Sequence, residues 1–116
     1  MSFVNVFKRG EIAIVTISRG KVNAFNGEVV DELRAAFEQL EKDSATKAVI
    51  LSGSGKFFSY GFDVPEFCDY SREQFEKFLV NFTEFCAYLF PYPKPIIAAI
   101  NGHATAGGCI LAMLCD

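Results

Sequence analysis

Short runs of β-branched and other apolar residues alternate along this chain with longer segments of helical periodicity, and that order limits the folds it can adopt. Residues 3–7 and 12–17 have strand composition and flank Gly10, which predicts a β-hairpin over the first eighteen residues. Apolar residues recur at three- and four-residue spacing over residues 28–43, which predicts a helix with one buried face. Residues 47–52 then predict a short buried strand.

The second half of the chain continues the alternation. Ser71 and Gln74 have capping-box spacing and begin the longest predicted helix, which a group of three prolines ends. Residues 96–100 form a continuous apolar run, which predicts a strand buried on both faces. Residues 109–114 predict an apolar helix. The order β-β-α-β-α-β-α indicates an α/β fold in which helices pack on a sheet.

Length, charge and residue types exclude several classes of protein. The 116 residues allow a single domain, residues 1–116, and the net charge of −3 argues against a nucleic-acid surface, which would be basic. No apolar run reaches the roughly 18 residues of a membrane span. Four cysteines without C-x-x-C spacing and one histidine argue against a metal site. Because no secretory signal is visible, we expect unpaired thiols and a cytoplasmic location.

The chain ends on its apolar helix, at Asp116, without a polar tail. Such a helix would leave apolar surface in water. This ending indicates a domain that is cut on its C-terminal side.

Two glycine-containing turns are the candidate sites for chemistry. The first lies in residues 56–65, an aromatic segment that we expect to be a loop folded onto the core; the second is the Ala106-Gly107-Gly108 turn. Each follows an apolar strand, where open α/β sheets place ligands. Two N–H groups that converge there would form an oxyanion hole for a carbonyl oxygen that gains charge. Glycines at strand ends are more often plain turns, so the spacing alone leaves both interpretations open.

Four segments in a fixed order resemble the enoyl-CoA hydratase/isomerase, or crotonase, family. They read RGKVNAFN at residues 19–26, KAVILSG at 47–53, FFSYGFDV at 57–64 and KPIIAAINGHATAGG at 94–108. The resemblance covers nearly the whole chain. It implies a crotonase-like α/β spiral of ββα and βαβ units, of which this chain would be the N-terminal part.

The resemblance also implies a site and a substrate. Members of the family bind acyl-CoA thioesters, with coenzyme A as part of the substrate rather than a separate cofactor, and usually form homotrimers or hexamers. By motif position, the backbone N–H groups of Phe62 and Gly107 would hold the thioester enolate. The residues expected to contact the CoA thioester are Lys21, Val22, Ala24, Ser59, Gly61, Asp63 and Val64. Lys21 is equally well explained as a solvated surface lysine.

This chain departs from the hydratase pattern. Hydratases of the family carry a glutamate three residues after the second oxyanion glycine, where this chain has Ile110, and a second glutamate beyond Asp116. Isomerases keep only the later one, so the resemblance favours a double-bond isomerase over a hydratase. Phe62 is bulkier than the usual residue of the first loop, and its ring would shape the acyl pocket. Two alternatives stay open, a family member with other enolate chemistry and a non-catalytic CoA-binding fragment.

Overall fold

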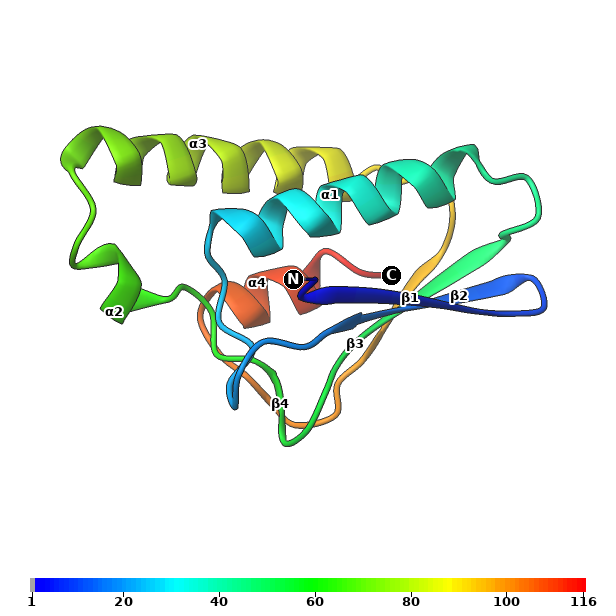
Figure 1. Ribbon diagram of the computed structural model, residues 1–116. Coiled ribbons are helices and arrows are strands. Elements are labelled where there is room, and N and C mark those ends of the chain that lie inside the picture. Colours follow the sequence, from blue (N-terminus) through cyan, green and yellow to red (C-terminus); the bar gives the residue numbers. More distant parts are fainter. Residues whose placement is uncertain (1) are drawn as a thin grey trace.

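Strands and helices alternate through residues 2–116, the part of the chain that the computed structural model describes (Figure 1). The elements are β1 (Val4–Arg9), β2 (Ile12–Ile17), α1 (Gly27–Lys42), β3 (Ala48–Gly53), β4 (Phe57–Ser59), α2 (Val64–Phe67), α3 (Arg72–Leu89), β5 (Ile96–Ala99), β6 (His103–Ala104) and α4 (Gly107–Met113). The predicted α/β class is confirmed. None of the helices in these residues combines the length and the apolar character that crossing a membrane requires.

Four strands form the main sheet in the order β1-β2-β3-β5. β1 and β2 make the predicted antiparallel hairpin, and Gly10 in its turn has a φ of +63°, which a residue without Cβ adopts readily. β3 runs parallel to both β2 and β5. Because side chains alternate between the two faces of a strand, Ala13, Val15 and Ile17 all point to one face, where they are fully buried.

Helices α1 and α3 pack against each other along the same side of the main sheet (Figure 1). The buried stripe of α1 is the predicted one, with Leu33 and Phe37 in the core. The capping box that begins α3 is also confirmed. The Phe37 ring lies 6.4 Å from Phe85 of α3 and 5.3 Å from Tyr92, centroid to centroid, so aromatic contacts join the two helices. These helices support the loops at one end of the sheet.

The prediction of a loop over residues 56–65 is wrong in part. Phe57–Ser59 is strand β4, which pairs in parallel with β6, and Val64–Phe67 is the short helix α2. β4 has three residues and β6 two, too few for a periodic pattern to be visible in the sequence. Asp63 caps α2 by accepting a hydrogen bond from the N–H of Glu66 at 3.1 Å.

The prediction that residues 96–100 are buried on both faces is also wrong. Ile96 is buried, but Ile97 is 57% exposed and Ile100 is 56% exposed. The strand β5 lies at the edge of the main sheet, and α1 and α3 both pack on one side of that sheet. Among residues 2–116 nothing covers the opposite face at Ile97, so a fully apolar strand is half exposed here.

Candidate functional site

Hydrogen bonds from the buried Asn23 and the exposed Asn101 join the segments that carry the sequence motifs. The side-chain N–H groups of Asn23 donate to the carbonyl oxygens of Ser54 and Phe57, at 3.0 and 2.9 Å. The amide of Asn101 donates to the Phe57 carbonyl as well, at 3.0 Å. These bonds link three separate segments: the loop before α1, the β3–β4 turn and the β5–β6 turn. They therefore fix the positions of the three segments relative to one another.

The two glycine-containing turns meet at the end of β4 and β6. A Cβ built on Gly61 would lie 2.8 Å from the backbone nitrogen of Gly107 and 2.9 Å from the Thr105 carbonyl oxygen, so only glycine fits there. Gly61 also has a φ of +104°, a region that side chains disfavour. Thr105 stabilises this contact with two hydrogen bonds. Its N–H donates to the Ser59 carbonyl at 3.0 Å, and its hydroxyl donates to the Tyr60 carbonyl at 2.8 Å.

The residue before Gly107 in the second turn has a strained backbone conformation. Ala106 has a φ of +50° although it carries a Cβ, and it directly precedes the first residue of α4, Gly107. A non-glycine residue in this region costs on the order of 1 kcal/mol or more, which surrounding contacts must offset. The unusual dihedral angle sets the direction of the Gly107 N–H.

The backbone N–H groups of Phe62 and Gly107 have no hydrogen-bond partner among residues 2–116. One edge of the first turn pairs with Phe25: the Phe25 N–H donates to the Gly61 carbonyl at 2.7 Å, and the Asp63 N–H donates to the Phe25 carbonyl at 2.9 Å. Because successive backbone N–H groups of an extended segment point to opposite edges, the Phe62 N–H points away from Phe25. Within residues 2–116 neither the Phe62 N–H nor the Gly107 N–H donates a hydrogen bond to a protein atom. The turns therefore offer two unpaired donors from segments in contact.

A cavity of about 530 Å³ lies beside the first turn. Five of the residues predicted from the sequence line it, namely Lys21, Val22, Ala24, Phe62 and Asp63. The cavity wall also includes residues that the sequence did not single out: Phe3, Arg19, Gly20, Tyr60 and Pro65. The loop before α1 and the turn after β4 thus both line one space.

Three of the predicted contact residues do not line this cavity. Ser59 is fully buried, and its hydroxyl donates to the Asn23 carbonyl at 2.7 Å and accepts from the Gly61 N–H at 3.1 Å. Gly61 lies against the second turn, as described above. Val64 is exposed at the start of α2 and faces a different cavity. In the described chain, Ser59 and Gly61 hold the turn in shape rather than facing the space.

Arg19 is the site residue that sequence reasoning missed. Its guanidinium donates to the Asp63 carboxylate at 2.7 Å, to Glu66 at 3.1 Å and to the Ala24 carbonyl at 3.1 Å. Tyr70 completes the cluster by donating to Glu66 at 2.6 Å, and this hydrogen bond, together with partial burial, raises the pKa of Tyr70 to about 12. Asp63 and Glu66 follow Arg19 by 44 and 47 residues, so no local sequence pattern indicates that these side chains interact.

A second cavity, of about 300 Å³, also borders the first turn. Its lining residues are Phe62, Val64, Phe67, Cys68 and Phe75. Among the described residues, Phe62 alone lines both this cavity and the larger one beside Arg19. The first turn therefore borders two spaces.

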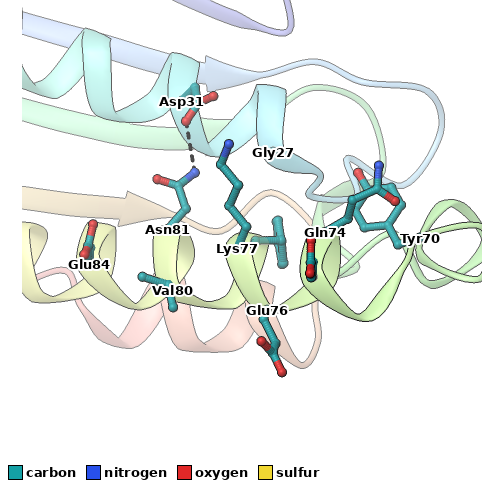
Figure 2. Close-up of a pocket in the computed structure, with 11 residues that line it drawn as sticks. Gly27, Asp31, Tyr70, Gln74, Glu76, Lys77, Val80, Asn81 and Glu84 are labelled. Carbon is teal, nitrogen blue, oxygen red and sulfur yellow. Dashed lines mark hydrogen bonds between the residues drawn. The ribbon is translucent and has the colours of Figure 1, made fainter.

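A separate groove of about 790 Å³ runs between α1 and α3, away from the glycine turns. Figure 2 shows Asn81 of α3 pointing toward Asp31 of α1, and the two side chains share a hydrogen bond of 2.9 Å. Lys77 and Glu84 also line the groove. It contains none of the residues predicted from the sequence, so it carries no part of the expected chemistry.

Ile110 lies on α4, three residues after Gly107, and its side chain is 46% exposed. An aliphatic side chain has no proton to exchange and no hydrogen-bonding atom. All four cysteines are unpaired in the described chain, and burial raises the pKa of Cys115 to about 11. Among residues 2–116, no three His, Cys, Asp or Glu side chains cluster as metal ligands would.

Comparison with known protein families identifies the family of this chain. The model of the enoyl-CoA hydratase/isomerase family matches residues 8–116, which is nearly the whole chain. The chain belongs to the enoyl-CoA hydratase/isomerase family. Its motif segments lie inside the matched region, and the predicted membership is confirmed.

Curated relatives of this family member are named hydratases. A short-chain-enoyl-CoA hydratase of Clostridium acetobutylicum is 40% identical over 111 residues, which cover 94% of this chain and 42% of the relative. A mitochondrial enoyl-CoA hydratase of Pongo abelii is 36% identical over 110 residues, covering 94% of this chain and 37% of the relative. The chain spans about two fifths of the length of these relatives. Their names give no support to the preference for an isomerase.

Solved structures confirm the fold of this part of the family. Pseudomonas aeruginosa DspI superposes with a TM-score of 0.93 at 32% identity, covering all of this chain and 48% of that one. An enoyl-CoA hydratase from Bacillus anthracis superposes with a TM-score of 0.93 at 28% identity, covering 99% of this chain and 46% of that one. The predicted crotonase-like α/β fold is therefore confirmed, with this chain covering less than half of it.

Proposed function

We propose that the whole protein binds an acyl-CoA thioester and stabilises its enolate between the N–H groups of Phe62 and Gly107. The observation that carries the proposal is the pair of unpaired donors in two turns that touch. A thioester carbonyl accepts weak hydrogen bonds in the ground state and much stronger ones when its oxygen becomes anionic. Donors held in place by the fold therefore favour the enolate over the substrate.

The larger cavity is the proposed path of coenzyme A to these donors. Lys21 lines it, and its ammonium group suits the phosphates of the CoA moiety, whereas the charge of Arg19 is already paired with Asp63 and Glu66. Val22 and Ala24 offer carbon surface for the pantetheine arm. The buried Ser59 and Gly61 act on the substrate only through the shape of the first turn. Asp63 lines the cavity and is paired there with Arg19.

Two fates of the enolate remain as proposals for the whole protein. The aliphatic Ile110 supports isomerisation, because a single carboxylate elsewhere in the protein can move one proton between two carbons. The hydratase names of the relatives favour hydration, which needs a group to activate water as well as a group to deliver a proton. Assays of both reactions on matched chain lengths distinguish them: faster hydration of 2-enoyl-CoA than isomerisation of 3-enoyl-CoA would reject the isomerase. We further propose the homotrimer or hexamer that is usual for the family.

Substitution of Gly107 tests the donor role. Gly107→Pro removes the N–H, while Gly107→Ala keeps it and adds a similar Cβ, 3.3 Å from the Phe62 ring. Proline is tolerated at the first position of a helix, so both variants have a route to folding. We expect turnover of Gly107→Pro to be about 10²–10³-fold below that of Gly107→Ala.

Folding is checked by circular dichroism, and binding by calorimetry with a saturated acyl-CoA. Equal turnover in two folded variants would reject the oxyanion assignment. Binding of acyl-CoA by the whole protein without turnover of any enoyl-CoA would instead support the non-catalytic CoA-binding alternative.

A further inference from the structure

Phe62 lines both of the cavities that border the first turn. The larger cavity, about 530 Å³, has Arg19 and Lys21 on its wall, and the smaller one, about 300 Å³, has Phe67 and Phe75. Among residues 2–116, Phe62 alone is common to both. The residue that carries one of the two proposed donors therefore also lines both cavities. A carbonyl group bound by its N–H would lie close to its ring.

Aromatic neighbours hold this ring in one orientation. The Phe62 ring meets Phe78 and Phe82 of α3 edge to face, with centroids 5.0 Å apart in both pairs and interplanar angles of 89° and 88°. Phe67 adds a third contact at 6.0 Å. Phe78 and Phe82 are buried in the core, so the ring cannot turn aside without displacing them.

Gly107 of the second turn also lies next to the ring. A Cβ on Gly107 would lie 3.3 Å from two carbon atoms of the Phe62 ring, which is tighter than ordinary contact. The ring therefore lies next to both the second turn and α3. A chain of atoms passing from the larger cavity to the smaller one would have to replace the ring.

The smaller cavity has the chemistry of an alkyl site. Four of its five lining residues, Phe62, Val64, Phe67 and Phe75, present only carbon side chains, and the fifth is Cys68. Such a surface binds methylene groups and leaves a polar group without partners. It shares Phe62 with the larger cavity, and none of the cationic residues of that cavity lines it.

We propose that the Phe62 ring ends the acyl site and makes the protein selective for short acyl chains. The proposal rests on the proposed function, since it assigns the acyl side of the same site. In the unsubstituted protein a short acyl group stops at the ring, and a long one is rejected. Without the ring, the carbon-lined cavity joins the larger one and accepts the additional methylene groups.

The test measures chain-length preference in the whole protein. The ratio of kcat/KM for dodecenoyl-CoA to kcat/KM for crotonyl-CoA is compared in the unsubstituted protein, Phe62→Ala, Phe62→Leu and Phe90→Ala. All keep the backbone N–H of residue 62, and Phe90 is a 68% exposed phenylalanine outside the site, which makes it a matched control. We expect the ratio to rise at least tenfold in Phe62→Ala and less in Phe62→Leu, because pocket contacts with methylene groups discriminate by about 10–200-fold.

Binding gives a second readout that does not depend on turnover. The affinity for dodecanoyl-CoA relative to butyryl-CoA, measured by calorimetry, should rise in Phe62→Ala and stay constant in Phe90→Ala. An unchanged ratio in a folded Phe62→Ala, or an unsubstituted protein that already prefers the long chain, would overturn the proposal. If Phe62→Ala does not fold, an unchanged ratio in Phe62→Leu overturns it. Failure of the unsubstituted protein to bind or turn over any acyl-CoA would instead reject the proposed function.

Discussion

Replacing Gly108 by alanine would place a methyl group inside the backbone of β4. A Cβ built on Gly108 lies 2.1 Å from the carbonyl oxygen of Ser59 and 2.8 Å from its carbonyl carbon. Ordinary contact begins near 3.4 Å, so α4 and β4 would have to separate by about 1.3 Å. Both partners are backbone atoms, and neither can rotate away as the end of a long side chain could.

The expected cost follows from two opposing effects. Glycine to alanine in a helix ordinarily stabilises a protein by about 0.5–1 kcal/mol. Overpacking a fitted contact ordinarily costs about 1–3 kcal/mol, and the Gly108 contact is closer than real Cβ atoms tolerate. We therefore expect Gly108→Ala to lower the free energy of unfolding by about 1–2 kcal/mol. Since Thr105 also bonds to the Ser59 carbonyl, the same movement should displace Gly107 and reduce turnover.

Urea unfolding of Gly108→Ala and Gly27→Ala provides the measurement. Gly27 is the first residue of α1, and a Cβ there meets nothing within 4 Å, so Gly27→Ala should be neutral or slightly stabilising. The comparison cancels the general effect of adding a methyl group to a helical glycine. If Gly108→Ala is as stable as Gly27→Ala, the close approach of α4 to β4 is not as described and the reasoning is refuted.

Two further predictions concern charged side chains. Arg19→Met should lower the free energy of unfolding by about 1.5–3 kcal/mol, because it leaves the Asp63 carboxylate, 18% exposed, without its charged partner. Arg19→Lys should lower it less. Equal stability of Arg19→Met and the unsubstituted protein in urea unfolding would contradict a stabilising role of the Arg19–Asp63 ion pair. Hydrogen bonds, above all from Lys8, lower the pKa of Asp43 to about 2, so the stability it contributes is present above pH 4 and is lost as pH falls toward 2. Unfolding of Asp43→Asn should therefore depend less on pH between 4 and 2, and identical pH profiles of the two proteins would rule this contribution out.

Local patterns in the sequence predict most of the helices and strands of the main sheet. The stripe that buries Leu33 and Phe37 depends on spacing within one helix, and the capping box of α3 depends on residues three apart. The glycine-rich turns are visible for the same reason, since residue type and order carry them. The family resemblance then directs attention to Phe62 and Gly107, although periodicity alone left their turns ambiguous.

Only the tertiary structure decides what those turns contact. The pairing of β4 with β6 joins Phe57 to His103, and the Arg19 cluster joins residues 44 and 47 positions apart. Neither leaves a periodic signal, because the partners lie on different elements and their meeting depends on how the elements pack. The exposure of Ile97 has the same origin: its hydrophobicity is a property of the residue, whereas its cover depends on which elements reach that face of the sheet. The position of the Phe62 ring beside the two cavities is likewise set by Phe78 and Phe82, which the chain brings to it from a separate helix.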